Sequence, residues 1–424
     1  MVANLELLEE IALPGCLGEL LPRWLNQVPL YRQAARAVPP DRLTTSAFQR
    51  LPFITKQDIR RNFPRNFLRH GVELDALLEL DLVEIEHTSG TSEERTPLLL
   101  ERGWWDTQEA RALRLNRHLR AVLAENPEAR RATITPPFCS GEVCYAGRPS
   151  RANRTLGNTL FVNLSRQPFL WSDAELARMT EEITDWAPHF LDVDPVYGML
   201  FARYCERHHV RLPTLKFILC SYEFLSAHHR RILQRVFGVP VYNLYGSTET
   251  GHLLMEDEQG DLIPSAETAF LEIIQADNDG IGELAVTTLT NEYMPLIRYR
   301  IGDLVERSCA TGHPVYTVHG RVRESVMRPD GTRVTVRQVD ACLAGTPGLA
   351  HYQLLERQRG SWTLRIAGEG SSLTPANRAW LQYRLRELLG ATEDLVIQET
   401  DSLLAESSGK FRLVYPLNLT SDST

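Results

Sequence analysis

Residues 217–249 read FILCSYEFLSAHHRRILQRVFGVPVYNLYGSTE, and this stretch decides the fold. A short apolar run at 217–220 is followed by a helical pattern over 227–237 and by a second apolar run that starts at 241. A strand, a helix and a strand in that order form a βαβ unit, whose strands lie parallel in a sheet that helices cover. The stretch therefore predicts an α/β fold with a largely buried parallel sheet.

The same alternation continues towards the N-terminus. Further strands are expected where short runs of apolar, β-branched or aromatic residues occur, at 133–135, 159–162 and 190–193. Further helices are expected at 173–186 and 195–208. Several βαβ units in succession would form one parallel sheet.

Helical patterns dominate the first part of the chain. Residues 1–50 read as helical, and residues 104–124 predict one amphipathic helix. Thr55 is a candidate helix N-cap, because Asp58 lies three residues on, in the capping-box position.

The pattern changes after about residue 260, where residues 282–289 alternate with period two and predict antiparallel strands. A shorter unit begins near residue 320, with strands expected at 333–336, 362–367 and 395–399 and a helix at 375–389. A length of 424 residues suits two or three domains at about 150 residues each. We therefore expect a large α/β N-terminal body, residues 1–320, with mixed β-sheets flanked by helices, and a smaller α+β C-terminal domain, residues 321–424.

Composition limits the classes of partner. Lys and Arg number 46 and Asp and Glu number 54, so the formal net charge is −8. Nucleic acids and anionic membranes are disfavoured as partners, because an acidic protein repels them. No run of about 18 uncharged apolar residues predicts a transmembrane helix. The odd number of cysteines, seven, and an acidic N-terminal segment without signal-peptide features lead us to expect a cytoplasmic protein with free thiols.

A hydroxyl-rich loop, His87-Thr88-Ser89-Gly90-Thr91-Ser92, follows a strand-like run. Its hydroxyls and backbone N–H groups suit a phosphate, although a polar hairpin turn would look the same. A Walker-type loop needs a Lys after its second Gly, and this loop has none, so an ordinary P-loop nucleotidase is disfavoured.

The end of the 217–249 stretch carries a second candidate site. Tyr245 could stack on a base, and Glu249 could bind Mg²⁺, which prefers one or two carboxylates together with phosphate oxygens. An ordinary strand-to-loop turn with a surface Glu is the alternative for this segment alone.

Three later segments add charged groups behind glycines. Asp303, in Tyr299-Arg300-Ile301-Gly302-Asp303, could accept both hydroxyls of a ribose, with Arg300 near the phosphate. Arg321 follows Gly320, and Lys410 follows Ser408-Gly409. A Lys on such a loop can meet a transferring phosphoryl group, although a basic tail near a terminus is more often simply solvated.

Taken in order, these segments resemble the motifs of the adenylate-forming ligase superfamily, which includes acyl-CoA synthetases, adenylation domains of peptide synthetases and luciferases. The ordered set is Thr88-Ser89-Gly90-Thr91, Tyr245-Gly246-Ser247-Thr248-Glu249, Tyr299-Arg300-Ile301-Gly302-Asp303, Gly320-Arg321 and Ser408-Gly409-Lys410. Three further segments resemble its phenylacetate–CoA ligase-like branch: Leu51-Pro52-Phe53-Ile54-Thr55-Lys56, Thr287-Thr288-Leu289-Thr290 and Met294-Pro295-Leu296-Ile297-Arg298-Tyr299-Arg300.

The resemblance implies a two-step reaction: a carboxylic acid attacks the α-phosphorus of ATP to give an acyl-adenylate and pyrophosphate, and the acyl group then passes to a thiol, usually that of CoA. It implies phosphate contacts from Thr88, Ser89, Gly90, Thr91 and Thr248, Mg²⁺ binding by Glu249, and an adenine and ribose site from Ser221, Tyr222, Glu223, Asn243, Tyr245, Gly246, Ser247, Asp303, Arg300 and Arg321. Lys410 would bridge the α-phosphate and the acid during adenylation. Arg323 would lie near a hinge about which the small domain swings between half-reactions.

The chain departs from the family at three places. The phosphate loop continues Glu93-Glu94, and two carboxylates near a triphosphate are unfavourable unless they face solvent. The stretch after Glu249 lacks the Cys and His of the zinc site that many members carry, so no zinc is expected. The turn Asp330-Gly331 differs from the pantetheine-tunnel pattern of CoA-forming members, so CoA is less secure than ATP.

An aromatic wall of Phe138, Tyr145, Phe224 and Tyr245 would suit an aryl or other planar acid, although each ring could equally be ordinary core. The pairs His208-His209 and His228-His229 read as exposed helix residues without a role.

Three alternatives remain open at this stage. The acyl acceptor could be a carrier-protein thiol or an amine, the chain could be a degenerate relative that binds a nucleotide without turnover, and a homodimer is left open.

Overall fold

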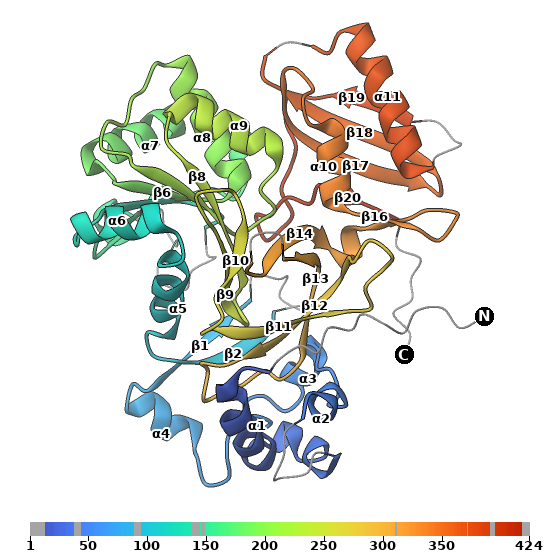
Figure 1. The fold of residues 1–424 in the computed structure, drawn as a ribbon. Coiled ribbons are helices and arrows are strands. Elements are labelled where there is room, and N and C mark those ends of the chain that lie inside the picture. The colour runs from blue at the N-terminus through green and yellow to red at the C-terminus, as the bar shows by residue number, and fades with distance from the viewer. Residues whose placement is uncertain are drawn as a thin grey trace.

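The computed structural model describes residues 13–37, 44–88, 95–137, 145, 149–309, 312–370, 372–390 and 395–417. A twelve-stranded mixed sheet forms its centre, in the order β11-β12-β13-β14-β10-β9-β8-β7-β6-β3-β5-β4 (Figure 1). Its strands are β3 (Arg131–Ile134), β4 (Thr155–Leu156), β5 (Thr159–Phe161), β6 (Phe190–Val193), β7 (Phe217–Cys220), β8 (Val241–Ser247), β9 (Gly251–Glu256), β10 (Leu262–Pro264), β11 (Ala269–Ile274), β12 (Gly282–Thr288), β13 (Tyr299–Ser308) and β14 (Val315–Arg321).

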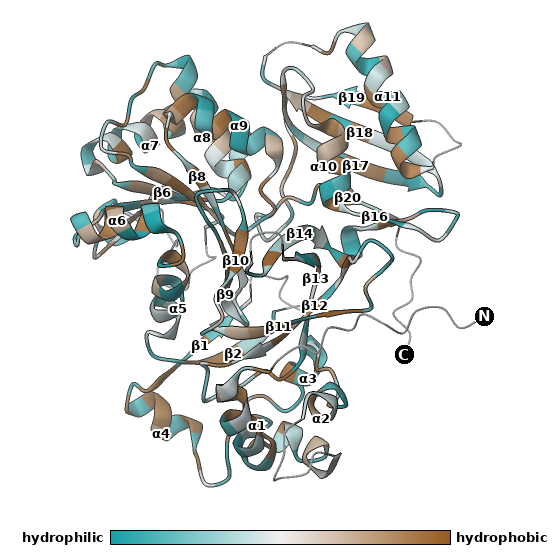
Figure 2. Ribbon diagram, viewed as in Figure 1, coloured by the Kyte–Doolittle hydropathy of each residue, from teal (hydrophilic) through white to brown (hydrophobic). Residues whose placement is uncertain are grey.

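One half of this sheet is parallel, because β5, β3, β6, β7 and β8 pair in parallel register. Every residue of β6 and β7 is buried, as expected of strands that helices cover on both faces. Helices α7 (Asp173–Trp186), α8 (Pro195–Arg207) and α9 (Ala227–Phe237) share one apolar core with the sheet. Helices α5 (Trp104–Leu113) and α6 (Arg117–Glu125) contribute to a second core. Figure 2 shows apolar strands in this half with more polar helices outside them.

The other half is antiparallel and packs against the N-terminal helices in a third core. The elements on that side are α1 (Gly15–Gln27), η1 (Pro29–Tyr31), η2 (Ala34–Ala37), α2 (Thr45–Gln49), α3 (Lys56–Arg60), α4 (Leu74–Glu79), β1 (Val83–His87) and β2 (Pro97–Glu101). We call everything from α1 to β14 the body.

The residues after β14 form a second unit, which we call the C-terminal unit. Its elements are η5 (Val322–Glu324), β15 (Val326–Met327), β16 (Arg333–Val334), α10 (Val336–Leu343), β17 (Leu349–Gln358), β18 (Ser361–Gly368), α11 (Pro375–Leu389), β19 (Leu395–Glu399) and β20 (Val414–Tyr415). Strands β19-β18-β17-β20 form a separate sheet with its own apolar core. In Figure 1 this unit stands beside the α/β half of the body.

The mixed α/β class and the βαβ reading are confirmed, and so is the capping box at Thr55 and Asp58. The single helix expected over residues 104–124 is wrong, because two helices lie there. Asn116 causes the break: its side chain accepts a hydrogen bond from the Leu119 backbone N–H, and its amide donates to the carbonyl of Glu256.

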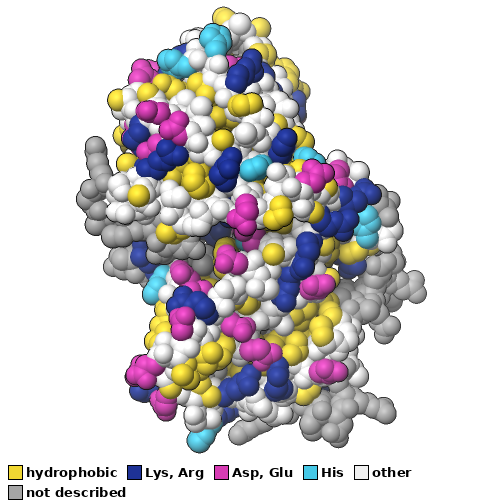
Figure 3. Space-filling view, turned by 90° about the vertical axis from the view of Figure 1, so that its left-hand side faces the viewer, with side chains coloured by type: hydrophobic (Ala, Val, Ile, Leu, Met, Phe, Trp, Pro, Cys, Tyr) yellow, Lys and Arg dark blue, Asp and Glu magenta, His cyan; other side chains and the backbone are white. Residues whose placement is uncertain are grey.

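Within the described ranges, no helix is both long and apolar enough to cross a membrane. On the face shown in Figure 3, Lys and Arg side chains are interspersed with Asp and Glu, without a broad patch of one sign.

Candidate active site

A cavity of about 2500 Å³ lies between the body and the C-terminal unit, and both contribute to its walls. Parallel strands β6, β7 and β8 end at this cavity, where ligands usually bind in open α/β sheets. Most of the residues that the sequence motifs singled out and that the structure describes line it.

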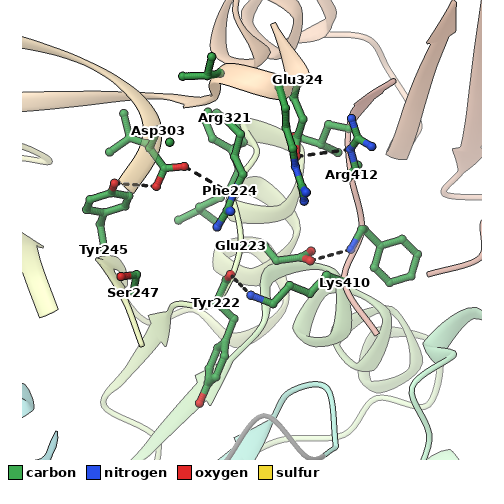
Figure 4. Close-up of a pocket in the computed structure, with 18 of the residues that line it drawn as sticks. Tyr222, Glu223, Phe224, Tyr245, Ser247, Asp303, Arg321, Glu324, Lys410 and Arg412 are labelled. Atoms are coloured by element: carbon green, nitrogen blue, oxygen red, sulfur yellow. Dashed lines mark hydrogen bonds and ion pairs between the residues drawn. The ribbon is translucent and has the colours of Figure 1, made fainter. Parts of the chain in front are cut away.

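One wall is formed by Tyr245 on β8, Asp303 on β13 and Arg321 on β14 (Figure 4). Asp303 and Arg321 lie directly opposite each other in the antiparallel register, and Arg321 Nε is 3.5 Å from Asp303 Oδ1. The Tyr245 hydroxyl donates to Asp303 Oδ2 at 2.8 Å. Burial, and then the Asp303 carboxylate, hold the pKa of Tyr245 well above its usual range, so its hydroxyl keeps its proton. The group is a buried, oriented carboxylate that can accept further hydroxyl donors.

The turn after β8 depends on Gly246. A Cβ on this residue would lie 2.2 Å from the carbonyl oxygen of Gly251, where no side chain fits. The close approach of β8 and β9 places Ser247, Thr248 and Glu249 at the cavity.

Glu249 lies at the bottom of that turn and is buried. Lys56 Nζ is 3.0 Å from Glu249 Oε1, and the Tyr299 hydroxyl donates to the same oxygen at 3.0 Å. Burial would raise the pKa of Glu249, but the Lys56 ammonium and hydrogen bonds outweigh it and hold the pKa below its usual range. Glu249 is therefore an ionised carboxylate that already attracts a cation.

The segment after β7 supplies three more groups. Ser221 Oγ donates to Asp192 Oδ1 at 3.1 Å, and Tyr222 adopts a left-handed backbone conformation with φ 75°. Glu223 accepts a 2.6 Å hydrogen bond from the backbone N–H of Phe411. Burial raises the pKa of Glu223 well above its usual range.

Lys410 reaches this wall from the C-terminal unit. Its Nζ donates to the backbone carbonyl of Tyr222 at 3.4 Å (Figure 4). The loop before it is seated on the body, because the Tyr197 hydroxyl donates to the Gly409 carbonyl at 2.9 Å. Gly409 has φ 88°, and a Cβ there would lie 2.9 Å from Pro136. A glycine at this position is what allows Lys410 to enter the cavity.

Three predicted residues that line the cavity also make contacts that the motifs did not suggest. The Arg300 guanidinium pairs with Glu283 on β12, with Nε 3.0 Å from its carboxylate. Phe224 packs against the core of the C-terminal unit. Arg323 lies in η5 and is half-exposed, 4.0 Å from Glu324.

Other predicted residues are placed only in part. Thr88 is buried, and its hydroxyl accepts a hydrogen bond from the Thr96 backbone N–H at 3.0 Å. The Asn243 backbone N–H donates to Glu256, and Tyr145 is half-buried. Ser89, Gly90, Thr91, Glu93, Glu94 and Phe138 lie outside the described residues.

The exposed reading of His228 and His229 is wrong, because their exposed fractions are 2% and 1%. Helix α9 lies between α8 and strand β17 of the C-terminal unit, so opposite sides of the helix are covered. His208 and His209 are exposed, as expected.

Lys56 belongs to a branch motif, but the motifs do not predict it as a site residue. Its signal is its place directly after the Thr55 N-cap, which directs the first turn of α3 towards Glu249. Four charged or polar residues, Glu109, Arg131, Asp192 and His252, also line the cavity and were missed. No group of three His, Cys, Asp or Glu in the described part of the chain could hold a metal ion by itself.

Comparison with known proteins identifies relatives over most of the chain. No family model matches it. The phenylacetate-coenzyme A ligase of Escherichia coli (strain K12) is 26% identical over 426 residues, which cover 92% of this chain and 91% of the relative. The enzyme of the same name from Aromatoleum evansii is 25% identical, over 78% of this chain and 74% of its own.

Solved structures share the fold. A 2-hydroxyisobutyryl-CoA ligase in the postadenylation state matches with a TM-score of 0.71 at 17% identity, over 95% of this chain and 88% of that chain. The same enzyme in the thioesterification state matches with a TM-score of 0.57 at 16% identity, with the same coverage. The curated relatives and the shared fold support the resemblance to the adenylate-forming superfamily, in its phenylacetate–CoA ligase-like branch.

Proposed function

We propose that the protein is an ATP-dependent acid–thiol ligase, which activates a carboxylic acid as an acyl-adenylate and transfers the acyl group to CoA. One observation carries the proposal: Lys410 enters from the C-terminal unit into a cavity that also holds Asp303 and Glu249. The names of the curated relatives, which are CoA ligases, support the same reaction.

In the first half-reaction a carboxylate oxygen of the acid attacks the α-phosphorus of ATP, and pyrophosphate leaves. Catalysis of this kind depends on positioning and on neutralising charge. Asp303 would accept the ribose hydroxyls, and Thr248 would contact the α-phosphate. The Lys410 ammonium would lie between the α-phosphate and the acid, with the Tyr222 carbonyl holding it in place.

Glu249 fits a divalent cation, because it is a buried, ionised carboxylate that attracts the Lys56 ammonium. Mg²⁺ held there would supply charge neutralisation for the phosphates of ATP. Lys56 is partly exposed, so it can turn from Glu249 towards a phosphate when the metal binds.

In the second half-reaction the thiol sulfur attacks the acyl carbonyl carbon, its proton is lost, and AMP leaves. We propose that residues 321–424 act as a mobile domain for this step and residues 1–320 as the fixed domain, with the hinge near Arg323. The separate sheet and core of the C-terminal unit support this division.

The test is ATP–pyrophosphate exchange with a panel of aryl, amino-aryl and aliphatic acids, followed by product analysis with CoA, with amines and without an acceptor. Exchange with particular acids is expected, and Lys410→Ala should lower it about 100-fold or more, the usual effect of removing one preorganised charge-stabilising group. Lys216→Ala, at an exposed Lys outside the cavity, is the matched control.

Unchanged exchange in Lys410→Ala would remove Lys410 from the mechanism. AMP binding without exchange for any acid would identify a nucleotide-binding relative without turnover. Exchange without a CoA product, but with product from an amine, would change the acceptor.

A further inference from the structure

A second group of charged and polar side chains lines the cavity on the body side, apart from the groups assigned to adenylation. We call it the polar end and define it as Glu109 on α5, Arg131 on β3, Asp192 on β6 and His252 on β9. Four separate elements therefore deliver one polar group each to the same part of the wall.

Contacts join three of these four residues, and His252 interacts electrostatically with Glu109. Arg131 Nη2 donates to Glu109 Oε2 at 2.6 Å, and Arg131 Nη1 is 3.7 Å from Asp192 Oδ2. The Trp105 ring covers His252, with ring centroids 4.7 Å apart. His252 is only 8% exposed, and its Nε2 has no hydrogen-bond partner among the described residues.

Packing alone accounts for only part of the polar end. The Arg131–Glu109 pair can tie α5 to the sheet, which is an ordinary structural role for an ion pair. Asp192 already accepts from Ser221 Oγ and lies near Arg131, but the pair gives no reason for a buried imidazole nitrogen without a partner. Buried polar groups normally have hydrogen-bond partners, so the unpartnered nitrogen of His252 indicates a ligand.

The charge state of the polar end favours a ligand that donates hydrogen bonds. Burial raises the pKa of Asp192 to about 6 despite the nearby Arg131, and burial lowers the pKa of His252 to about 4. Near pH 7 the group therefore holds Arg131 as a cation, Glu109 and Asp192 mainly as anions and His252 as a neutral ring. The sum is one negative charge, with acceptor positions left on Asp192 and His252.

Tyr222 connects this end to the proposed reacting centre. Its backbone carbonyl accepts from Lys410 Nζ at 3.4 Å, while its side chain hydrogen-bonds Asp192. Figure 4 shows the Tyr222 side chain running away from Lys410. Tyr222 therefore contacts both Lys410 and Asp192, so the polar end adjoins the proposed reacting centre through one residue.

We propose that the acid activated here carries an amino group at the end remote from its carboxyl group, and that Asp192 is the residue that selects it. The inference rests on the proposed function and narrows its substrate class. An amine would donate to Asp192 and reach the His252 side of the wall. An acid with a bare ring or alkyl end would bring no donor to Asp192 and would leave the His252 nitrogen unpaired, and buried sites discriminate strongly against such a loss.

The experiment compares acids that differ in one group: phenylacetate, its amino and hydroxyl derivatives, and alkyl acids with and without a terminal amine. Exchange is measured as kcat/KM for each acid. For each pair, the kcat/KM of the acid that carries an amino group should exceed that of the unsubstituted acid at least about tenfold, as expected for one buried hydrogen bond to a charged group. The aryl and alkyl arms distinguish a neutral amine from an ammonium group.

Asp192→Asn is the test variant, because it keeps the shape and removes the charge. It should fold, since burial already disfavours the charged form of Asp192. The amino preference should fall about tenfold or more in this variant. Asp194→Asn is the matched control: Asp194 lies two residues further along the chain and caps α8, a role that Asn also fills, and the preference should be unchanged.

Each outcome separates this inference from the proposed function. The inference is overturned, while the ligase assignment stands, if unsubstituted and amino-substituted acids give equal exchange. It is also overturned if Asp192→Asn keeps the parental preference for amino-substituted acids. A preference for the hydroxyl derivative overturns the proposal that the acid carries an amino group. If none of the acids supports exchange, the proposed function itself is overturned.

Discussion

Glu249 is a buried carboxylate whose ionised state depends on one lysine. Lys56 is partly exposed, whereas Glu249 is 5% exposed, so the pair is asymmetric in its access to water. Removing the ammonium would leave a buried charge with fewer partners, which costs more than the pair contributes when intact.

Lys56→Met is therefore expected to destabilise the ligand-free protein at neutral pH by about 1 to 2 kcal/mol, a value reduced by solvent screening at the exposed lysine. In the parent the lowered pKa of Glu249 contributes stability above about pH 4.5, which is lost as the pH falls. In the variant burial dominates and the pKa rises, so the difference between the two proteins should grow with pH. Thermal unfolding at several pH values measures it.

Lys216→Met, at an exposed lysine before β7, controls for the loss of any positive charge. A stability difference that does not change with pH would contradict the coupling of Lys56 to Glu249.

Sequence reasoning at this scale succeeded where the chemistry is local. The capping box of Thr55 and Asp58 needs only three residues of spacing. Arg300 could not be placed in this way, because its partner Glu283 faces it across strands whose register shifts at a bulge. Such a pair depends on how two distant strands align, and spacing along the chain does not contain that information.

At the scale of elements, α9 and β17 join the two units through histidines. His229 Nε2 is 3.1 Å from His351 Nδ1, with both rings buried and Phe169 and Phe411 packed on His351. Burial lowers the pKa of His351 to about 3 and that of His229 well below its usual range. The pair is therefore neutral wherever the two units are docked.

The docked structure should lose stability as the pH falls from about 6.5 towards 3, because the unfolded chain takes up protons on these rings and the folded one does not. Between about pH 7.5 and 5, we expect the melting temperature of the double variant His229→Leu with His351→Phe to fall less than that of the parent. Calorimetry or fluorescence melting at the two pH values checks this.

His208→Gln, on the exposed end of the neighbouring helix, should keep the parental pH dependence. The same pH dependence in parent and double variant would show that other groups carry the acid sensitivity.

Helices and strands with a strong hydrophobic periodicity could be predicted from the sequence. Boundaries that depend on contacts with distant parts of the chain could not. The βαβ units follow from buried runs and helical periodicity, which are local patterns. The break at Asn116 depends on a carbonyl of β9, 140 positions away. The burial of His228 and His229 depends on the C-terminal unit, which no helical pattern could reveal.

At the scale of the molecule, Asp340 on α10 fastens the C-terminal unit to the body. Its carboxylate accepts from Ser226 Oγ at 2.5 Å and from the Ala227 backbone N–H at 2.9 Å, both at the start of α9. It also accepts from the Tyr352 hydroxyl within its own unit. This is the same boundary across which the Lys410 loop is seated.

Asp340→Ala should loosen that seating without unfolding either unit. Amide hydrogen exchange at residues 405–411 is expected to rise several-fold, because their protection depends on contact with the body, while the amides of β18 change little. Asp330→Ala, in an exposed turn of the same unit, is the control. Equal exchange in both variants would show that the loop is held independently of α10.

The change in pattern near residue 320 predicts a second unit, and a separate sheet and core follow β14, but how this unit docks on the body could not be predicted. The Tyr197–Gly409 contact joins residues 212 positions apart, and its geometry follows only from the assembled surfaces. The family resemblance implies a role for Lys410, whereas its contact with the Tyr222 carbonyl follows only from the three-dimensional structure.

Tyr222 has a consequence for the accuracy of the enzyme. Because one residue holds Lys410 through its carbonyl and Asp192 through its side chain, an acid that displaces the ring also disturbs the acceptor of the lysine. Rejection of a wrong acid would then appear as slower turnover and not only as weaker binding, so errors would be reduced even when that acid is abundant.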